Sequence, residues 1–91
     1  MNISVTFRNI RPSENIKNYA EKKINKLTRY AGDNIDVKIV FSAEKFRHII
    51  ELSLIIDGHK IYGREESEDM YMGIDMVVDK IKRQIKKYKE K

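Results

Sequence analysis

Four segments of the chain alternate between apolar and polar residues, and this two-residue period predicts half-buried strands. They cover residues 2–8, 35–42, 46–56 and 59–64. Asp57-Gly58 separates the last two and is a strong hairpin signal, because a type I′ turn requires positive φ at both central residues. The apolar residues that the pattern turns toward a core are Ile3, Val5, Phe7, Ile35, Val37, Ile39, Phe41, Ile50, Leu52, Leu54, Ile56 and Ile61.

Two other segments change to a period of three to four residues, which predicts helices. The first covers residues 14–31, between Ser13 as N-cap and Gly32, which suits a left-handed C-cap. The second covers residues 69–91, with Ser67 as its predicted N-cap. Their apolar stripes are Ile16, Ala20, Ile24, Leu27 and Ala31 in the first and Met70, Ile74, Val77, Val78, Ile81, Ile85 and Tyr88 in the second.

The order of the predicted elements is strand, helix, three strands, helix. A strand–helix–strand start predicts a right-handed crossover between parallel strands, and short turns join the last three strands into a meander. Because only one face of each strand is consistently apolar, both helices are expected to cover the same face of the sheet. The predicted fold is therefore an α+β two-layer sandwich, β-α-β-β-β-α, and residues 1–91 are expected to form a single domain.

The other face of the predicted sheet carries a mixture of apolar and basic side chains. They are Lys38, Val40, Arg47, Ile49, Ile55, Tyr62 and Arg64. This face is either simply solvated or a second contact surface, and the sequence leaves both interpretations open.

Charge changes the picture, because the net charge of +5 is distributed unevenly. Residues 13–31 carry five bases and two acids, residues 64–79 one base and six acids, and residues 80–91 seven bases and one acid. Acids suit the start of the second helix and bases its end, where the helix dipole favours them. Seven bases are more than a favourable interaction with the helix dipole requires, and few acids remain in this segment to form i,i+4 ion pairs with them. Clustered positive charge on two helices indicates nucleic-acid binding, whereas the alternative is a solvated amphipathic surface.

Catalytic and metal-binding classes have little support. The chain has no cysteine, its four glycines form no phosphate-binding loop, and His48 and His59 lack the spacing of a zinc site. Asp75 and Asp79 share a helix face and leave a divalent-metal nuclease as a minor alternative. Pairing of Asp79 with Lys82 or Arg83 explains the same residues more simply. We expect no enzyme activity, no metal and no cofactor.

No segment resembles a signal peptide or a membrane span, and the expected location is cytoplasmic. A basic amphipathic helix can also lie on a membrane surface. That alternative conflicts with the predicted fold, because an apolar stripe that covers the sheet is not available to lipid.

The second predicted helix also carries a longer motif. Its parts are Asp69-Met70-Tyr71, Ile74-Asp75, Asp79-Lys80-Ile81, Arg83-Gln84-Ile85 and Lys87-Tyr88-Lys89. This motif resembles the second-helix signature of the ribosome hibernation promoting factors, also called ribosome-associated translation inhibitors. Glu44-Lys45, His48, the Asp57-Gly58 turn and the spacing of Lys23, Lys26 and Leu27 also look like this family, so the resemblance covers the whole chain.

The resemblance implies a double-stranded-RNA-binding-domain-like shape and a partner, the small ribosomal subunit with its rRNA. Members of the family bind in the channel where messenger and transfer RNA meet and block access to it during stress or stationary phase. The resemblance implies neither a small-molecule substrate nor a membrane partner. Longer members add a C-terminal dimerisation domain, so the chain is either a short form or the first domain of a long form. A general RNA-binding or RNA-chaperone module is the alternative function.

The candidate RNA-binding residues are basic residues of both helices. The resemblance carries over Lys23, Lys26, Lys80, Arg83, Lys87, Lys89 and Lys91, while the outer face of the first helix adds Lys22 and Arg29, and the basic run of the second adds Lys86. Such side chains neutralise phosphates and release counterions, so affinity is expected to fall steeply with salt. Changing Lys80, Arg83 and Lys87 together to Glu is expected to abolish ribosome binding and leave the fold intact.

Overall fold

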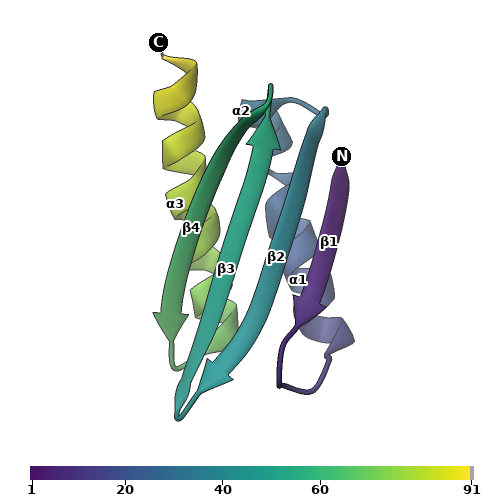
Figure 1. Cartoon of the computed structure of the whole chain (residues 1–91), viewed down its shortest axis with the longest axis vertical. Helices are drawn as coiled ribbons and strands as arrows, with labels where there is room; N and C mark the ends of the chain where they lie inside the picture. The colour runs from purple at the N-terminus through teal and green to yellow at the C-terminus, as the bar shows by residue number, and fades with distance from the viewer. Residues whose placement is uncertain (91) are drawn as a thin grey trace.

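The computed structural model describes residues 1–90, and within this range it confirms the predicted α+β arrangement. Its elements are β1 (Asn2–Phe7), α1 (Glu14–Asn25), α2 (Thr28–Ala31), β2 (Ile35–Glu44), β3 (Arg47–Ile56), β4 (His59–Ser67) and α3 (Met70–Lys89). The strands form a sheet in the order β1-β2-β3-β4. All three helical segments lie on one face of this sheet (Figure 1).

The pairing of the strands follows the predicted topology. β1 pairs with β2 in parallel, and the chain between them runs through α1 and α2. β2, β3 and β4 pair in antiparallel fashion through tight turns. Asp57 and Gly58 have φ values of 52° and 77°, which confirms the positive φ expected at both central positions of that hairpin.

The first helix is interrupted where the sequence predicts continuity. The N–H groups of Lys26 and Leu27 donate to carbonyls three residues back, so the helix tightens to a 3₁₀ geometry between α1 and α2. The Thr28 hydroxyl donates to the Asn25 carbonyl at 2.8 Å, a back-bond that bends helices. Leu27 stays buried, so the tightened turn keeps the apolar stripe on the sheet.

The start of α3 also differs from the prediction, since Ser67 is not its N-cap. The N-cap is Asp69, whose Oδ1 accepts from the Tyr71 N–H at 3.0 Å. Ser67 instead ends β4, buried opposite His48 in β3, and its Oγ accepts from the Asp69 N–H. The strand therefore continues three residues past the predicted end at residue 64.

The core lies between the sheet and the helices. The predicted inward residues of β2 and β3 are buried there, as are those of α3 except Val78 and Tyr88. These two residues and the inward residues of β1 pack against the core partly exposed. Two glycines allow the helix to approach the sheet closely: a Cβ on Gly63 would contact Ile81 of α3, and a Cβ on Gly73 would collide with Ile50 of β3. Within residues 1–90, no helix has the length and apolar character needed to cross a membrane.

Candidate nucleic-acid interface

A groove of about 300 Å³ separates the first helical segments, α1 and α2, from α3. Its lining residues are Lys23, Lys26, Leu27, Arg29, Tyr30, Asp75, Val78, Asp79 and Lys82. The predicted bases Lys23, Lys26 and Arg29 therefore meet on one wall. We call this site the interhelical groove.

Two lysines of α3 lie close to the ring of Tyr30, which lines this groove. The ammonium groups of Lys82 and Lys86 lie 5.2 and 5.0 Å from the centroid of its ring, within cation–π range. Lys82 lines the groove but was not among the candidate residues predicted from the sequence. Its helical angle indicates the same flank as Lys86, and that shared flank is the signal that could have identified it.

Asp75 is one of the two acidic residues that line the groove. The Tyr19 hydroxyl donates to its carboxylate at 2.7 Å, and this hydrogen bond raises the pKa of Tyr19 above its usual value. The Lys23 ammonium lies 3.7 Å from the same carboxylate and 5.3 Å from the Tyr19 ring centroid. Lys23 is thus held at the groove wall by one acid and one aromatic ring.

The carboxylates that suggested a nuclease have separate protein partners. Asp75 is engaged by Tyr19 and Lys23, while Asp79 pairs with Arg83 at 3.3 Å, one of the two pairings expected for it. Among residues 1–90, no group of three or more His, Cys, Asp or Glu side chains is arranged to hold a metal ion.

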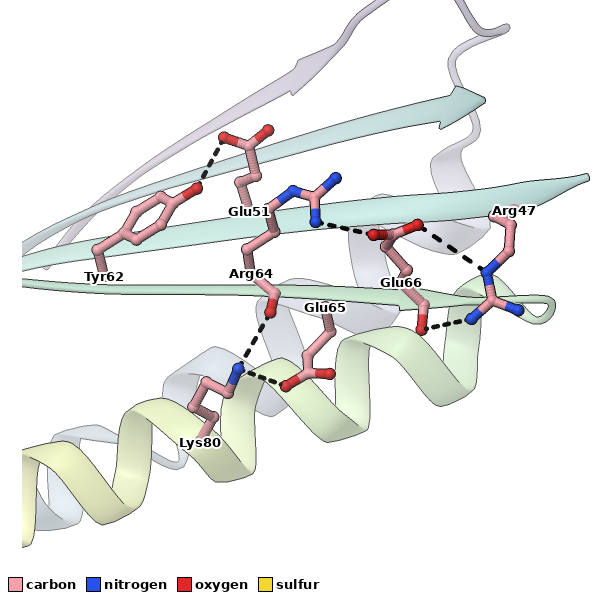
Figure 2. A network of polar contacts seen from close by, with 7 residues as sticks. All are labelled: Arg47, Glu51, Tyr62, Arg64, Glu65, Glu66 and Lys80. Atoms are coloured by element: carbon pink, nitrogen blue, oxygen red, sulfur yellow. Dashed lines mark hydrogen bonds and ion pairs between the residues drawn. The ribbon is translucent and has the colours of Figure 1, made fainter. Parts of the chain in front are cut away.

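Lys80 faces away from the interhelical groove. Its ammonium lies 2.7 Å from Glu65 and donates to the Arg64 carbonyl at 3.1 Å, as Figure 2 shows. One turn further on, the Gln84 amide donates to the Tyr62 carbonyl. This flank of α3 is therefore fastened to β4, and the Lys80 charge is already compensated.

The remaining candidates are Lys22 of α1 and bases on the two flanks and the outer ridge of α3. Lys22, Lys86 and Lys89 are exposed, and Lys87 lines a cavity beside β4. Arg83 lies on the outer ridge, paired with Asp79. Lys91 lies outside the described residues. The structure thus brings part of the predicted set together in one groove and places Lys80 and Lys87 on the opposite flank.

Part of the charge on the sheet face without helices is paired internally. Arg64 pairs with Glu66 at 2.9 Å, and the Arg47 guanidinium lies 3.9 Å from the other carboxylate oxygen of Glu66 (Figure 2). The Tyr62 hydroxyl donates to Glu51 at 3.1 Å. This pairing leaves neither Arg47 nor Arg64 as an uncompensated charge for a polyanion.

Comparisons with known proteins agree with this fold over the whole chain. Residues 3–91 match the family described as Sigma 54 modulation protein / S30EA ribosomal protein. The ribosome hibernation promoting factor of Azotobacter vinelandii is 32% identical over 91 residues, which are the whole chain and 85% of that relative. A ribosomal subunit interface protein from Coxiella burnetii has a TM-score of 0.93 at 29% identity, with both chains fully covered. The N-terminal domain of Thermus thermophilus Protein Y has a TM-score of 0.89 at 31% identity, covering 97% of this chain and 99% of that one.

These matches define an α+β protein of the ribosome-associated class. The chain belongs to the Sigma 54 modulation protein / S30EA ribosomal protein family, in which its relatives carry the name ribosome hibernation promoting factor. The family resemblance inferred from the sequence is thereby confirmed. Ribosome hibernation factors are a non-catalytic class of protein, which agrees with the expectation that the chain is not an enzyme.

Proposed function

We propose that the chain is a ribosome hibernation factor that binds rRNA of the small subunit in the channel for messenger and transfer RNA. Two basic helical segments make the contact, and residues 1–91 act as one ribosome-binding unit in the cytoplasm. Bound there during stress or stationary phase, the protein blocks access of both RNAs. The observation that carries this proposal is the interhelical groove, which gathers bases from α1, α2 and α3 in a member of this family.

The charge state of the groove supports a polyanionic partner. Lys26, Arg29 and Lys82 have no acidic partner within 4.0 Å among the described residues, whereas Lys80 and Arg83 do. Bases without an internal partner retain their full attraction for phosphate and release counterions when they bind it. Tyr30 holds Lys82 in place without neutralising it.

Inhibition by this route requires occupancy alone. Phosphate contacts position a protein but carry no sequence information, so the shape of the rRNA surface would select the site. No bond is made or broken, and release of the protein restores the channel.

Co-sedimentation with purified ribosomes tests the proposal directly. The protein is expected to pellet at one copy per empty ribosome and to be excluded when messenger and transfer RNA are bound. Excess free duplex RNA should not displace it. If the protein pellets equally with empty and occupied ribosomes, or if excess duplex RNA displaces it from them, it is a general RNA-binding module instead.

A pair of charge-reversal variants tests the groove itself. Changing Lys82 and Lys86 to Glu should weaken ribosome binding by about tenfold or more, because two phosphate contacts become repulsive. Changing Lys38 and Lys45 to Glu alters the net charge equally but lies away from the groove, and it should change affinity by less than about threefold. Equal losses in both variants would show that total charge, and not the groove, determines binding.

This pair is more informative than a variant that includes Lys80. Reversing Lys80 would place a carboxylate beside Glu65 and disturb the attachment of α3 to β4. A loss of ribosome binding in such a variant would then reflect the disturbed packing of α3 as well as the lost contact with the ribosome.

A further inference from the structure

A stacked pair of aromatic rings lies where β4 begins and α3 ends. The rings of His59 and Tyr88 have centroids 4.7 Å apart and an interplanar angle of 12°. Tyr88 is half-buried and packs against the hydrophobic core, whereas His59 is exposed. The core therefore fixes one end of the stack, and the other end is accessible from solvent.

A cavity of about 430 Å³ lies beside this pair. Its lining residues are His59, Lys60, Ile61, Gln84, Lys87 and Tyr88, which include two lysines and no acid. The volume falls within the range of roughly 300–1,000 Å³ that is typical of small-ligand pockets. Lys60 borders the cavity from β4, but strand alternation turns its side chain to the helix-free face of the sheet. The cation of Lys87 next to an accessible aromatic ring fits a ligand that is both anionic and flat.

Gln84 adds a directional group to the cavity. Its amide nitrogen donates to the Tyr62 carbonyl at 3.1 Å, which fixes the orientation of the carboxamide. The carboxamide oxygen is left as an acceptor. This oxygen can accept a hydrogen bond from an exocyclic amino group on the flat ring of a ligand.

We propose that this cavity binds one unpaired nucleotide of RNA, with its base stacked on His59 and its phosphate beside Lys87. Aromatic stacking of splayed-out bases is a general means of binding single-stranded RNA, and paired bases in a duplex have no free face to offer. This base site lies on the flank of α3 opposite the interhelical groove. The inference rests on the proposed function only because it takes RNA as the partner. It adds a contact to a base, whereas the other proposed contacts are to phosphates.

Fluorescence of 2-aminopurine tests the base site without ribosomes. The probe is a ten-nucleotide RNA single strand with 2-aminopurine at every second position, compared with the same strand annealed to its complement. The protein should quench the single strand, because a stacked base loses fluorescence. His59→Ala should abolish this quenching and weaken single-strand affinity about tenfold, while duplex affinity stays within about twofold.

Two further variants separate stacking from folding and from charge. His59→Phe keeps a flat ring against Tyr88 and should retain the quenching. Replacing Lys87 by Gln should weaken single-strand affinity but leave the quenching at saturation unchanged. Undiminished quenching by His59→Ala, or loss of quenching in both His59 variants with normal far-UV circular dichroism, would overturn the base site.

The outcomes distinguish this inference from the proposed function. If His59→Ala quenches like the unmodified protein while ribosome binding depends on Lys82 and Lys86, the base site is wrong and the hibernation function stands. If quenching depends on His59 but occupied ribosomes bind as well as empty ones, the base site stands and the ribosomal function is wrong.

Discussion

Tyr19 connects the two walls of the interhelical groove through a single side chain. Its hydroxyl donates to Asp75 of α3, and its ring meets Tyr71 of the same helix edge to face, at 5.0 Å between centroids. The Lys23 ammonium lies near both the Tyr19 ring and Asp75. One residue of α1 therefore fixes the spacing of α1 and α3 and the position of a groove lysine.

The pKa of Tyr19 provides a test of this contact. The hydrogen bond to Asp75 raises that pKa, with burial and nearby carboxylates acting in the same direction. Because the folded-state pKa lies above the unfolded value of about 10, the contribution to stability is complete below that pH and is lost as pH rises through the raised pKa. The unmodified protein should therefore lose more stability between about pH 9 and 11 than Tyr19→Phe does. Urea unfolding at stepped pH measures the difference.

A matched control replaces the acceptor instead of the donor. Asp75→Asn keeps an oxygen for the Tyr19 hydroxyl but removes the negative charge, so this variant should also lose less stability than the unmodified protein over the same pH range. Tyr62, whose pKa is also raised by burial and by Glu51, titrates in all three proteins and cancels from the comparison. Identical pH profiles for all three would show that the Tyr19–Asp75 contact contributes nothing to folding.

At the scale of elements, α3 packs on the sheet at a distance that Gly73 determines. A Cβ at this position would collide with the Cδ1 atom of Ile50 in β3. Ile50 is fully buried, so its side chain has little freedom to move aside. A residue without a side chain is required where the helix crosses this strand.

Substitution of Gly73 should therefore be destabilising in spite of the better helix propensity of alanine. Gly73→Ala is expected to lower the free energy of unfolding by about 1–3 kcal/mol through overpacking. Ile50→Val removes the colliding Cδ1 atom and should by itself cost about 0.5–1.5 kcal/mol. In the double variant the cost of Gly73→Ala should be smaller, a positive coupling measurable by urea denaturation. If the effects of the two substitutions on the free energy of unfolding are additive, the collision with Ile50 is not the cause of the destabilisation by Gly73→Ala.

The sequence predicts the elements well because their hydrophobic periods are local signals. The strands and both apolar helix faces follow from spacing, and the Asp57-Gly58 hairpin follows from residue types that tolerate positive φ. The errors lie at the ends of helices and strands, where tertiary contacts determine the residue at which an element begins or ends. Ser67 has the chemistry of an N-cap, yet pairing with His48 keeps it in β4 and transfers the cap to Asp69. The bend before Thr28 arises from one side-chain hydrogen bond that periodicity does not encode.

The candidate interface was predictable only in part for a related reason. Helical angles separate Lys80 and Lys87 from Lys82 and Lys86, but they do not say which flank faces another helix. Only the packing of α3 beside α2 assigns Lys82 to the groove and Lys80 to β4. Ion pairs across elements, such as Lys80 with Glu65, are likewise invisible to an i,i+4 analysis.

At the scale of the whole molecule, charge and shape are organised along α3. The molecule is elongated, with principal extents of 40 × 20 × 18 Å, and α3 runs along the long axis (Figure 1). The acids of residues 64–79 lie at the end of β4 and in the first half of α3, whereas the bases of residues 80–89 lie in the second half of this helix. Such a charge distribution orients the molecule in the field of a polyanion, with the basic end leading.

The salt dependence of binding to purified small subunits measures how many of these bases contact phosphate. The logarithm of the association constant should fall linearly with the logarithm of monovalent salt concentration, by about 0.7–0.9 per phosphate neutralised. Neutralising Lys82 and Lys86 to Gln should reduce the slope by about 1.4–1.8, whereas the same change at Lys38 and Lys45 should leave it unaltered. Magnesium is held constant, because it also competes for phosphate. Weaker binding with an unchanged slope would mean that the two lysines act through packing on Tyr30 rather than through their charge.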